Sequence, residues 1–260
     1  MSQQDTNTKV ECNFIRFGLI VTGKSESQHL PTLFRTLMAT GMCSFKVIRL
    51  SQQRGARTSK KRRMKMAGKG KIIPTKDEQE IGLPARKYLN ADHCRFLIFV
   101  DDLEHDRRSQ AQQLFNRYRL ALDTMLTEEQ KRRASVHFLV NMLEAYYFAD
   151  AQAMNQALKL NPPLEDYSGD VETIRHPKNE LKKLVAGFNE IEDGGKILER
   201  LNIEHVLSRS STCAWLRTLF AWCVKVLERH PHYEYFSLDE KYQLRGGKFS
   251  EVTRKQLNEL

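Results

Sequence analysis

The sequence predicts an α/β fold, in which a parallel β-sheet is flanked by helices. Apolar runs of strand length recur between residues 14 and 140, and segments with helical periodicity separate them. Strands joined through a helix run parallel, because only a long crossover returns the chain to the same end of the sheet. The 260 residues suffice for one large domain of this kind with a helical addition at its C-terminus.

The first predicted elements are a strand, a turn, a helix and a second strand. Residues 14–21 are mostly apolar and suit a buried strand, and Thr22-Gly23-Lys24-Ser25 then turns the chain. The helix follows from Ser27, a residue suited to an N-cap, and Gly41 ends it. Residues 43–50 supply the second strand, which we expect to lie parallel to the first.

Residues 54–71 form a strongly basic segment, which we call the basic insert. It has no hydrophobic periodicity, so we expect a loop inserted in the domain. The formal charge of +10 favours a polyanionic partner such as nucleic acid, and this segment concentrates the excess. The predicted phosphate contacts are its nine basic residues, Arg54, Arg57, Lys60, Lys61, Arg62, Arg63, Lys65, Lys69 and Lys71.

Two more strands and three more helices are predicted before residue 160. Residues 78–89 can form a short helix, and residues 94–100 form an apolar run that suits a central strand. A long amphipathic helix is expected over residues 107–126. Residues 135–140 then predict a fourth strand, followed by a helix over residues 145–158.

The domain boundary is predicted near Asn161-Pro162-Pro163, because prolines interrupt the helical pattern there. The expected organisation is a polar tail over residues 1–13, a sheet domain over 14–160 and a helical C-terminal region over 161–260. Helical periodicity within that last region covers residues 179–188, 195–201 and 212–229.

Acidic residues follow three of the predicted strands. Glu26 follows the first strand, Asp101, Asp102 and Glu104 follow the third, and Glu144 follows the fourth. Functional groups of open parallel sheets collect beyond the carboxyl ends of strands, and converging carboxylates suit Mg²⁺. Each Glu near a helix N-terminus can also complement the helix dipole alone, so a structural role stays open for Glu26 and Glu144.

The turn Thr22-Gly23-Lys24-Ser25 lacks the first glycine of a P-loop, so we do not expect an ATPase. Gly23 is expected to let the chain turn tightly, and Lys24 to contact phosphate.

The cysteines and the N-terminus predict a cytoplasmic location. The five cysteines are odd in number and form no C-x-x-C pair, so we expect reduced, mostly buried thiols. No apolar run approaches the roughly 20 residues of a membrane span. Residues 1–8 are polar and lack the pattern of a secretory signal.

Two segments resemble the motifs of TOPRIM domains, which have a Rossmann-like parallel sheet. Residues 19–26 are similar to the opening motif, a strand, a Gly turn and a Glu. Residues 96–104 are similar to the second motif, in which acids after the third strand bind Mg²⁺. The resemblance implies that Glu26 is a general acid/base or a metal-linked carboxylate, and that Asp101 is a metal ligand.

The second motif departs from the family pattern, because Leu103 occupies the position of the second Asp. Asp102 or Glu104 has to replace that Asp, and the sequence leaves both open. Glu144 resembles an additional acid of small stand-alone TOPRIM nucleases and of overcoming-lysogenization-defect nucleases, which makes it a further candidate metal ligand.

Among TOPRIM proteins the chain most resembles the effector subunit of PARIS-type anti-phage systems. This implies a Mg²⁺-dependent nuclease, with Mn²⁺ as a second possible cofactor, that cleaves tRNA as a toxic effector. It also implies an ABC-type ATPase partner and a homodimeric active form. Two alternatives stay open: a DNA-nicking TOPRIM endonuclease, and a non-catalytic nucleic-acid-binding regulatory subunit. In the C-terminal region, His176-Pro177-Lys178 and Ser208-Arg209-Ser210-Ser211 are candidate supporting elements.

Overall fold

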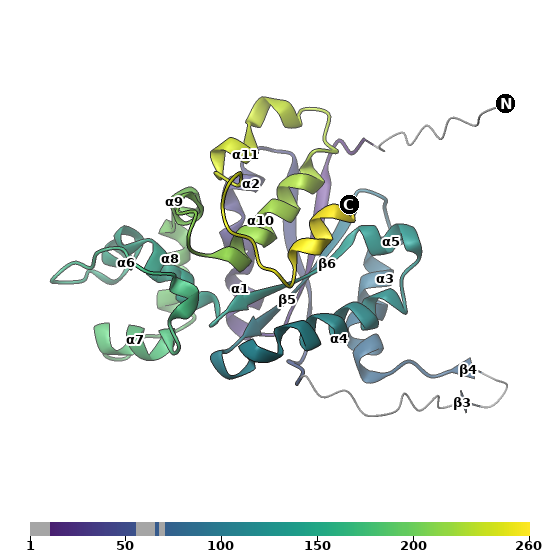
Figure 1. Ribbon diagram of the computed structural model, residues 1–260, viewed down its shortest axis with the longest axis horizontal. Coiled ribbons are helices and arrows are strands. Elements are labelled where there is room, and N and C mark those ends of the chain that lie inside the picture. The colour runs from purple at the N-terminus through teal and green to yellow at the C-terminus, as the bar shows by residue number, and fades with distance from the viewer. Residues whose placement is uncertain (1–10, 56–65, 68–70) are drawn as a thin grey trace.

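A parallel four-stranded sheet forms the centre of the molecule, as the sequence predicts (Figure 1). The computed structural model describes residues 11–55, 66–67 and 71–260. The strands lie in the order β2-β1-β5-β6, and all neighbouring pairs are parallel. Their bounds are β1 (Ile15–Val21), β2 (Cys43–Leu50), β5 (Arg95–Leu103) and β6 (Ala134–Val140).

Strand β5 extends further than predicted and includes two of the candidate acids, Asp101 and Asp102. Successive side chains of a strand point to opposite faces of its sheet. Phe96, Ile98 and Val100 accordingly belong to one hydrophobic core, and Leu97, Phe99 and Leu103 belong to the other. Asp101 and Asp102 therefore project to different faces, although they are neighbours in the sequence.

One face of the sheet is covered by helices α3 (Leu83–Leu89), α4 (Ala111–Asp123) and α5 (Glu128–Arg132). A π-helical turn (Glu78–Gly82) precedes α3. The helix predicted over 107–126 begins instead with a 3-10 turn (His105–Gln110). Its predicted apolar face is confirmed, since Leu114, Tyr118 and Leu122 are fully buried.

The other face carries α1 (Lys24–Leu33), α2 (Arg35–Met38) and α10 (Ala214–Leu227). Phe34 separates α1 from α2 and stacks on Phe45 of β2 and Phe220 of α10, with ring centroids 4.1 and 5.2 Å apart. Trp222 of α10 packs against Phe17 and Phe96 of the sheet. The boundary predicted near Asn161 thus does not coincide with a division of the hydrophobic core.

Helices α6 (Ala151–Leu158), α7 (Pro177–Leu184), α8 (Glu192–Arg200) and α9 (Ile203–Ser208) gather at one side of the sheet (Figure 1). The helix predicted over 145–158 is broken at Asp150, because a 3-10 turn (Leu143–Ala149) precedes α6. The sequence analysis missed α9, whose signal is its N-cap: the Asn202 side chain accepts hydrogen bonds from the backbone of Glu204 and His205.

The remaining elements are short. Strands β3 (Met66–Ala67) and β4 (Lys71–Ile72) pair antiparallel within the basic insert. Helix α11 (Leu238–Lys241) and three 3-10 turns (Val171–Thr173, Tyr233–Phe236 and Arg254–Asn258) complete the C-terminal region. Among the described residues, no helix combines the length and apolar character needed to cross a membrane.

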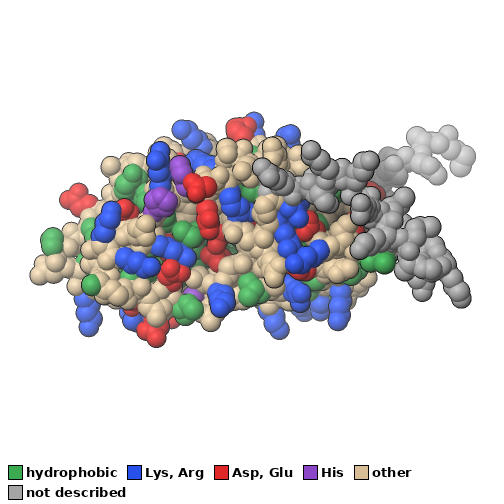
Figure 2. All heavy atoms as spheres, turned by 90° about the horizontal axis from the view of Figure 1, so that it is seen from below, with side chains coloured by type: hydrophobic (Ala, Val, Ile, Leu, Met, Phe, Trp, Pro, Cys, Tyr) green, Lys and Arg blue, Asp and Glu red, His purple; other side chains and the backbone are tan. Residues whose placement is uncertain are grey.

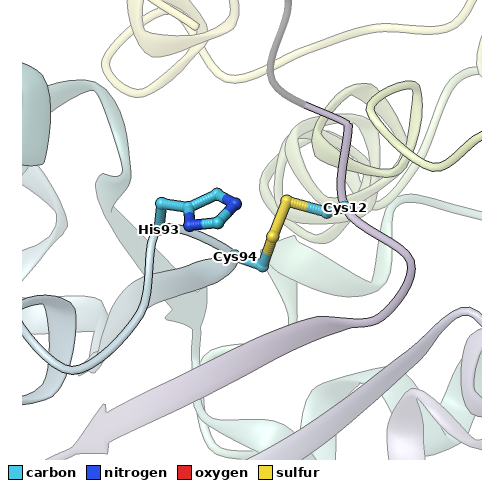
Figure 3. A group of neighbouring side chains, drawn as sticks. All are labelled: Cys12, His93 and Cys94. Atoms are coloured by element: carbon cyan, nitrogen blue, oxygen red, sulfur yellow. A yellow bond between two sulfur atoms is a disulfide. The ribbon is translucent and has the colours of Figure 1, made fainter.

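The prediction that all five cysteines are reduced is wrong for two of them. Cys12 and Cys94 form a disulfide across 82 residues of sequence (Figure 3). Each cysteine lies just before a strand, and β1 and β5 are neighbours in the sheet, so their starts come together. Sequence spacing could not reveal this pair, because it depends on which strands become neighbours. Cys43, Cys213 and Cys223 are free and buried, as predicted.

We predict that His137→Leu makes the protein more resistant to acid. His137 of β6 is fully buried beside Trp222, and neither ring nitrogen has a hydrogen-bond partner within residues 11–55, 66–67 and 71–260. Burial lowers the pKa of His137 from 6.5 to about 3. Between these two pH values only the unfolded chain binds the proton, so the folded state loses stability as the pH falls, by about 1.4 kcal/mol per pH unit.

Acid unfolding followed by circular dichroism tests this prediction, with the exposed His232→Leu as the matched control. The midpoint of His137→Leu should shift to lower pH, whereas the control should unfold like the wild type. Equal acid-unfolding midpoints for the wild type and both variants would contradict this effect of the buried His137.

Candidate metal centre

Glu26 and Asp102 bring their carboxyl groups together at the carboxyl ends of β1 and β5. Glu26 lies in the first turn of α1, directly after β1, and Asp102 is the penultimate residue of β5. After β1 the chain continues to β2, which lies on one side of β1, whereas β5 lies on its other side. The loop after β1 and the loop after β5 therefore diverge at this point. The two carboxyl groups share a hydrogen bond. Two of the predicted acids are thus direct neighbours.

Gly23 makes room for this pair. A Cβ atom on Gly23 would lie 1.6 Å from Oε2 of Glu26 and 3.1 Å from Oδ2 of Asp102. The backbone of Gly23 is extended, with φ of −104° and ψ of 153°, so any residue could adopt its conformation. From the sequence, Gly23 is expected to permit a tight turn. The structure gives a different reason, which is the space taken by the Glu26 carboxyl group.

Glu144 and Lys178 complete the centre from the segments that follow β6. Glu144 is buried, and neither of its carboxyl oxygens has a hydrogen-bond partner among the residues that the structure describes. Lys178 lies in the first turn of α7, and its Nζ lies 3.6 Å from Oε1 of Glu144 and 2.7 Å from Oε2 of Glu190. The ammonium group therefore lies beside the acids and partly offsets the rise that burial causes in the pKa values of Glu26 and Glu144. Sequence analysis missed Glu190, which no motif marks.

Asp101 lies on the opposite face of β5 and is fully paired. Its carboxylate accepts hydrogen bonds from Thr22 at 2.6 Å, Tyr118 at 2.7 Å and Arg107 at 2.8 Å. Arg107 also donates to the backbone carbonyl of Asp102 at 2.6 Å. The sequence predicted a metal ligand at Asp101. The structure instead places it in an ion pair that fixes the loop after β1 and the end of β5.

Glu104 lies beyond the end of β5 and is exposed. Instead of facing Glu26, it lines a small cavity of about 100 Å³ with His105, Asp106, Asn141, Met142, Arg175 and His176. The sequence left open whether Asp102 or Glu104 replaces the second Asp of the motif. The geometry favours Asp102, because Asp102 is the acid that joins Glu26.

The surroundings of these acids disfavour their ionised forms. Burial, followed by the charges of Glu26, Asp101 and Glu144, raises the pKa of Asp102 well above its ordinary value. Burial also raises the pKa of Glu26, and it raises that of Glu144 to about 7. A nearby cation favours ionised carboxylates, so these shifts mark a place where a positive charge would be stabilising.

The donor set fits a hard divalent cation such as Mg²⁺. Oδ1 of Asp102 and both carboxyl oxygens of Glu144 are buried without a hydrogen-bond partner in the described ranges of the chain, and Mg²⁺ prefers oxygen ligands. In the part of the chain that the structure describes, the one group of three acid, His or Cys ligand atoms within 4.8 Å of one another lies elsewhere. A cation bound by all three acids would have to draw Glu144 towards Glu26 and Asp102.

The predicted phosphate-binding residues have different surroundings. Arg54 is buried and forms ion pairs with Asp77 and Glu80, so the structure gives it a structural role in place of the predicted phosphate contact. Lys24 is exposed at the start of α1. Lys71 belongs to β4, and the other predicted contacts lie outside the described residues: Arg57, Lys60, Lys61, Arg62, Arg63, Lys65 and Lys69.

Figure 2 shows the molecule from below the view of Figure 1. On this face acidic side chains form a narrow band, and Lys and Arg side chains lie on both sides of it. Such an arrangement places positive charge next to an acidic band, where the phosphates of a polyanion could be bound.

We predict that Gly23→Ala weakens the binding of divalent cations. The added Cβ would displace the Glu26 carboxyl group, which would separate it from Asp102. Titration calorimetry with Mn²⁺ should give an affinity lower by about tenfold or more, as expected when one ligand is misplaced. Gly55→Ala is the matched control, because a Cβ there meets no atom within 4 Å. Equal Mn²⁺ affinities for the two variants would contradict this function of Gly23.

We also predict that Glu144→Gln stabilises the metal-free protein at alkaline pH. The folded-state pKa of about 7 exceeds the ordinary value of 4.5, so the wild type loses stability as the pH rises from 4.5 to about 7. Removing this carboxylate should recover roughly 1–3 kcal/mol at pH 8. Urea unfolding in EDTA at pH 4 and pH 8 measures the effect, which should be confined to the higher pH. A stability loss at both pH values would contradict it.

The comparisons with known proteins give a family without an assigned activity. No curated protein and no solved structure matches the chain. A family model, described as "Domain of unknown function (DUF4276)", matches residues 21–220. This segment runs from the last residue of β1 into α10. It contains the residues of the centre, Glu26, Asp102, Glu144, Lys178 and Glu190. The chain therefore belongs to the DUF4276 family.

Proposed function

We propose that this chain is a Mg²⁺-dependent nuclease of the TOPRIM type, with Glu26, Asp102 and Glu144 as the acids that hold the cation. The observation that carries the proposal is the pair formed by the buried Glu26 and the half-buried Asp102 at the carboxyl ends of β1 and β5. Two carboxyl groups in hydrogen-bond contact are stable only when a proton or a cation lies between them. Mn²⁺ presents a similar preference for oxygen ligands and is a second candidate.

When bound, such a cation supplies the activation of water and the stabilisation of charge on a phosphodiester. The residues of the chain prepare the centre for it. Gly23 and the first turn of α1 hold Glu26 against Asp102. These carboxyl groups give up their shared proton when a cation binds, so cation affinity increases with pH.

Lys178 is positioned to act on the phosphate. Its ammonium group is paired with Glu190 and lies beside Glu144. The ammonium group would donate to a phosphate oxygen bound beside Glu144, while its ion pair with Glu190 would hold the side chain in place. Lys178 thereby contributes positive charge where negative charge develops during phosphoryl transfer.

The net charge of +10 and the basic insert support a nucleic acid as the substrate. On the resemblance to PARIS-type effectors, we propose tRNA as the preferred substrate and infection of the host cell as the setting. The same resemblance supports an ABC-type ATPase that restrains the nuclease, a homodimeric active form and a cytoplasmic location. A DNA-nicking enzyme and a non-catalytic binding subunit are the alternatives that the following experiment separates.

We predict that Glu26→Gln and Asp102→Asn each reduce cleavage by about 100-fold or more, because each removes a charge that holds the cation. Total RNA and supercoiled plasmid are incubated with the full chain in Mg²⁺, Mn²⁺ or EDTA, and the product ends are mapped. Cleavage of tRNA in Mg²⁺ but not in EDTA is expected. Nicking of the plasmid alone would favour the DNA enzyme.

Two control variants sharpen this test. Glu104→Gln should retain most of the activity, since Glu104 is exposed and does not face Glu26. Glu128→Gln alters an exposed carboxylate of α5 and should have no effect. Folding of every variant is checked by circular dichroism. Wild-type cleavage by folded Glu26→Gln and Asp102→Asn would remove this site from the mechanism, and metal-independent binding without cleavage would favour the regulatory subunit.

A further inference from the structure

Cys12, His93 and Cys94 gather at the amino ends of β1 and β5, away from the strand ends that carry the acids (Figure 3). One ligand atom of each residue lies within 4.8 Å of the other two. In the part of the chain that the structure describes, this is the sole group of three such ligand atoms at that spacing. Figure 3 shows the His93 ring turned towards the two sulfur atoms.

We propose that the dithiol form of this chain binds one transition-metal ion of the zinc type between Cys12, His93 and Cys94. Thiolates and imidazole are the ligands that Zn²⁺ prefers, whereas Mg²⁺ takes oxygen. Two thiolates and one neutral imidazole balance the charge of a divalent ion, so the site would add no net charge to a half-buried position. This second metal site is independent of the nuclease proposal.

The backbone holds the two cysteines in place without help from the bond between their sulfur atoms. The backbone N–H of Cys12 donates to the carbonyl of Arg229, and that of Arg16 donates to the carbonyl of Cys94, both at 3.0 Å. The Cα atoms of the two cysteines are 5.6 Å apart. At about 2.3 Å per zinc–sulfur bond, two thiolates at a tetrahedral ion lie roughly 3.8 Å from each other, which side-chain rotation can provide from this spacing.

Asp92 supports His93 as a ligand. Its Oδ1 lies 3.5 Å from Nδ1 of His93 and accepts a hydrogen bond from the backbone of Cys94 at 3.0 Å. Its Oδ2 pairs with Arg16 at 2.9 Å. A carboxylate beside one ring nitrogen of a histidine fixes the ring and leaves the other nitrogen free for a metal. Asp92 thus leaves Nε2 of His93 for the ion.

The site would be open on one side. Cys12 and Cys94 are buried, with 2% and 7% exposure, whereas the His93 side chain is 59% exposed. Three protein ligands leave the fourth position of a tetrahedral ion to water. The bound ion would connect the start of β1 with the start of β5. In the oxidised chain the disulfide makes this connection.

The disulfide and the metal site exclude each other, because both use the same two sulfur atoms. Conversion requires two electrons and two protons. A dithiol supplies both and becomes a disulfide, whereas a phosphine supplies the electrons and water supplies the protons and the oxygen of the resulting phosphine oxide. The ion then displaces the two thiol protons. In a reducing compartment such as the cytoplasm, which the sequence predicts, thiols are the favoured form.

Co²⁺ titration of the full chain tests the proposal, because thiolate-bound Co²⁺ absorbs in the near ultraviolet. The chain is reduced with a phosphine under anaerobic conditions and titrated with Co²⁺, and Zn²⁺ is then added as a competitor. We expect a charge-transfer band that saturates at one Co²⁺ per chain and disappears with Zn²⁺. The oxidised chain should give no band.

Three variants locate the ion. Cys12→Ser should lose the band, and His93→Ala should weaken Co²⁺ binding by about tenfold or more. His93→Ala still forms the disulfide, so it gives a result even if Cys12→Ser does not fold. Cys43→Ala, which alters a buried free cysteine, is the matched control and should bind like the wild type.

Absence of the band in the reduced wild type would overturn the proposal, as would unchanged binding by Cys12→Ser or His93→Ala. The nuclease proposal is tested separately, because carboxylate-bound Co²⁺ gives no thiolate band. Glu26→Gln should therefore keep the band whatever its effect on cleavage.

Discussion

The parallel pairing of β1 with β5 is the constraint on which both ends of the molecule depend. Arg16 lies opposite Arg95 at the start of this pair, and Val21 lies opposite Val100 near its end. This pairing brings Cys12 and Cys94 together at the amino ends of the two strands. At the carboxyl ends it brings Glu26 and Asp102 together. Neither pair is close in sequence, and both follow from one register of backbone hydrogen bonds.

Side chains alternate between the two faces of a strand, so the two Asp residues at the end of β5 have different functions. Asp101 faces α4 and the 3-10 turn before it, where Tyr118 and Arg107 satisfy its oxygens, so it stabilises the strand end on which the centre is built. Asp102 faces the other side and meets Glu26, and burial together with the charge of Glu26 raises the pKa of Asp102. Like charges buried together cost stability, and functional sites commonly retain groups of this kind because a ligand neutralises them.

The C-terminal region supplies both packing and charge to the sheet. Trp222 and Phe220 of α10 pack on aromatic side chains of the sheet and of the α1–α2 junction, and this apolar burial offsets part of the cost of the acidic centre. Lys178 at the start of α7 brings an ammonium group to Glu144. The region completes the fold and the centre together, and the family match extends through it from β1 into α10.

The sequence by itself determined the parallel α/β class, the strand positions and the acids at the strand ends, because these depend on local periodicity and on short motifs. Only the tertiary structure decided that Asp102 joins Glu26, that Asp101 and Arg54 form ion pairs, that Gly23 provides space and that Cys12 meets Cys94. A shift of one residue along a strand reverses the face of every side chain, and the predicted end of β5 at Val100 left the faces of both Asp residues undetermined. Which strands become neighbours is likewise a property of the whole fold, since contacts between distant segments form only when the sheet assembles.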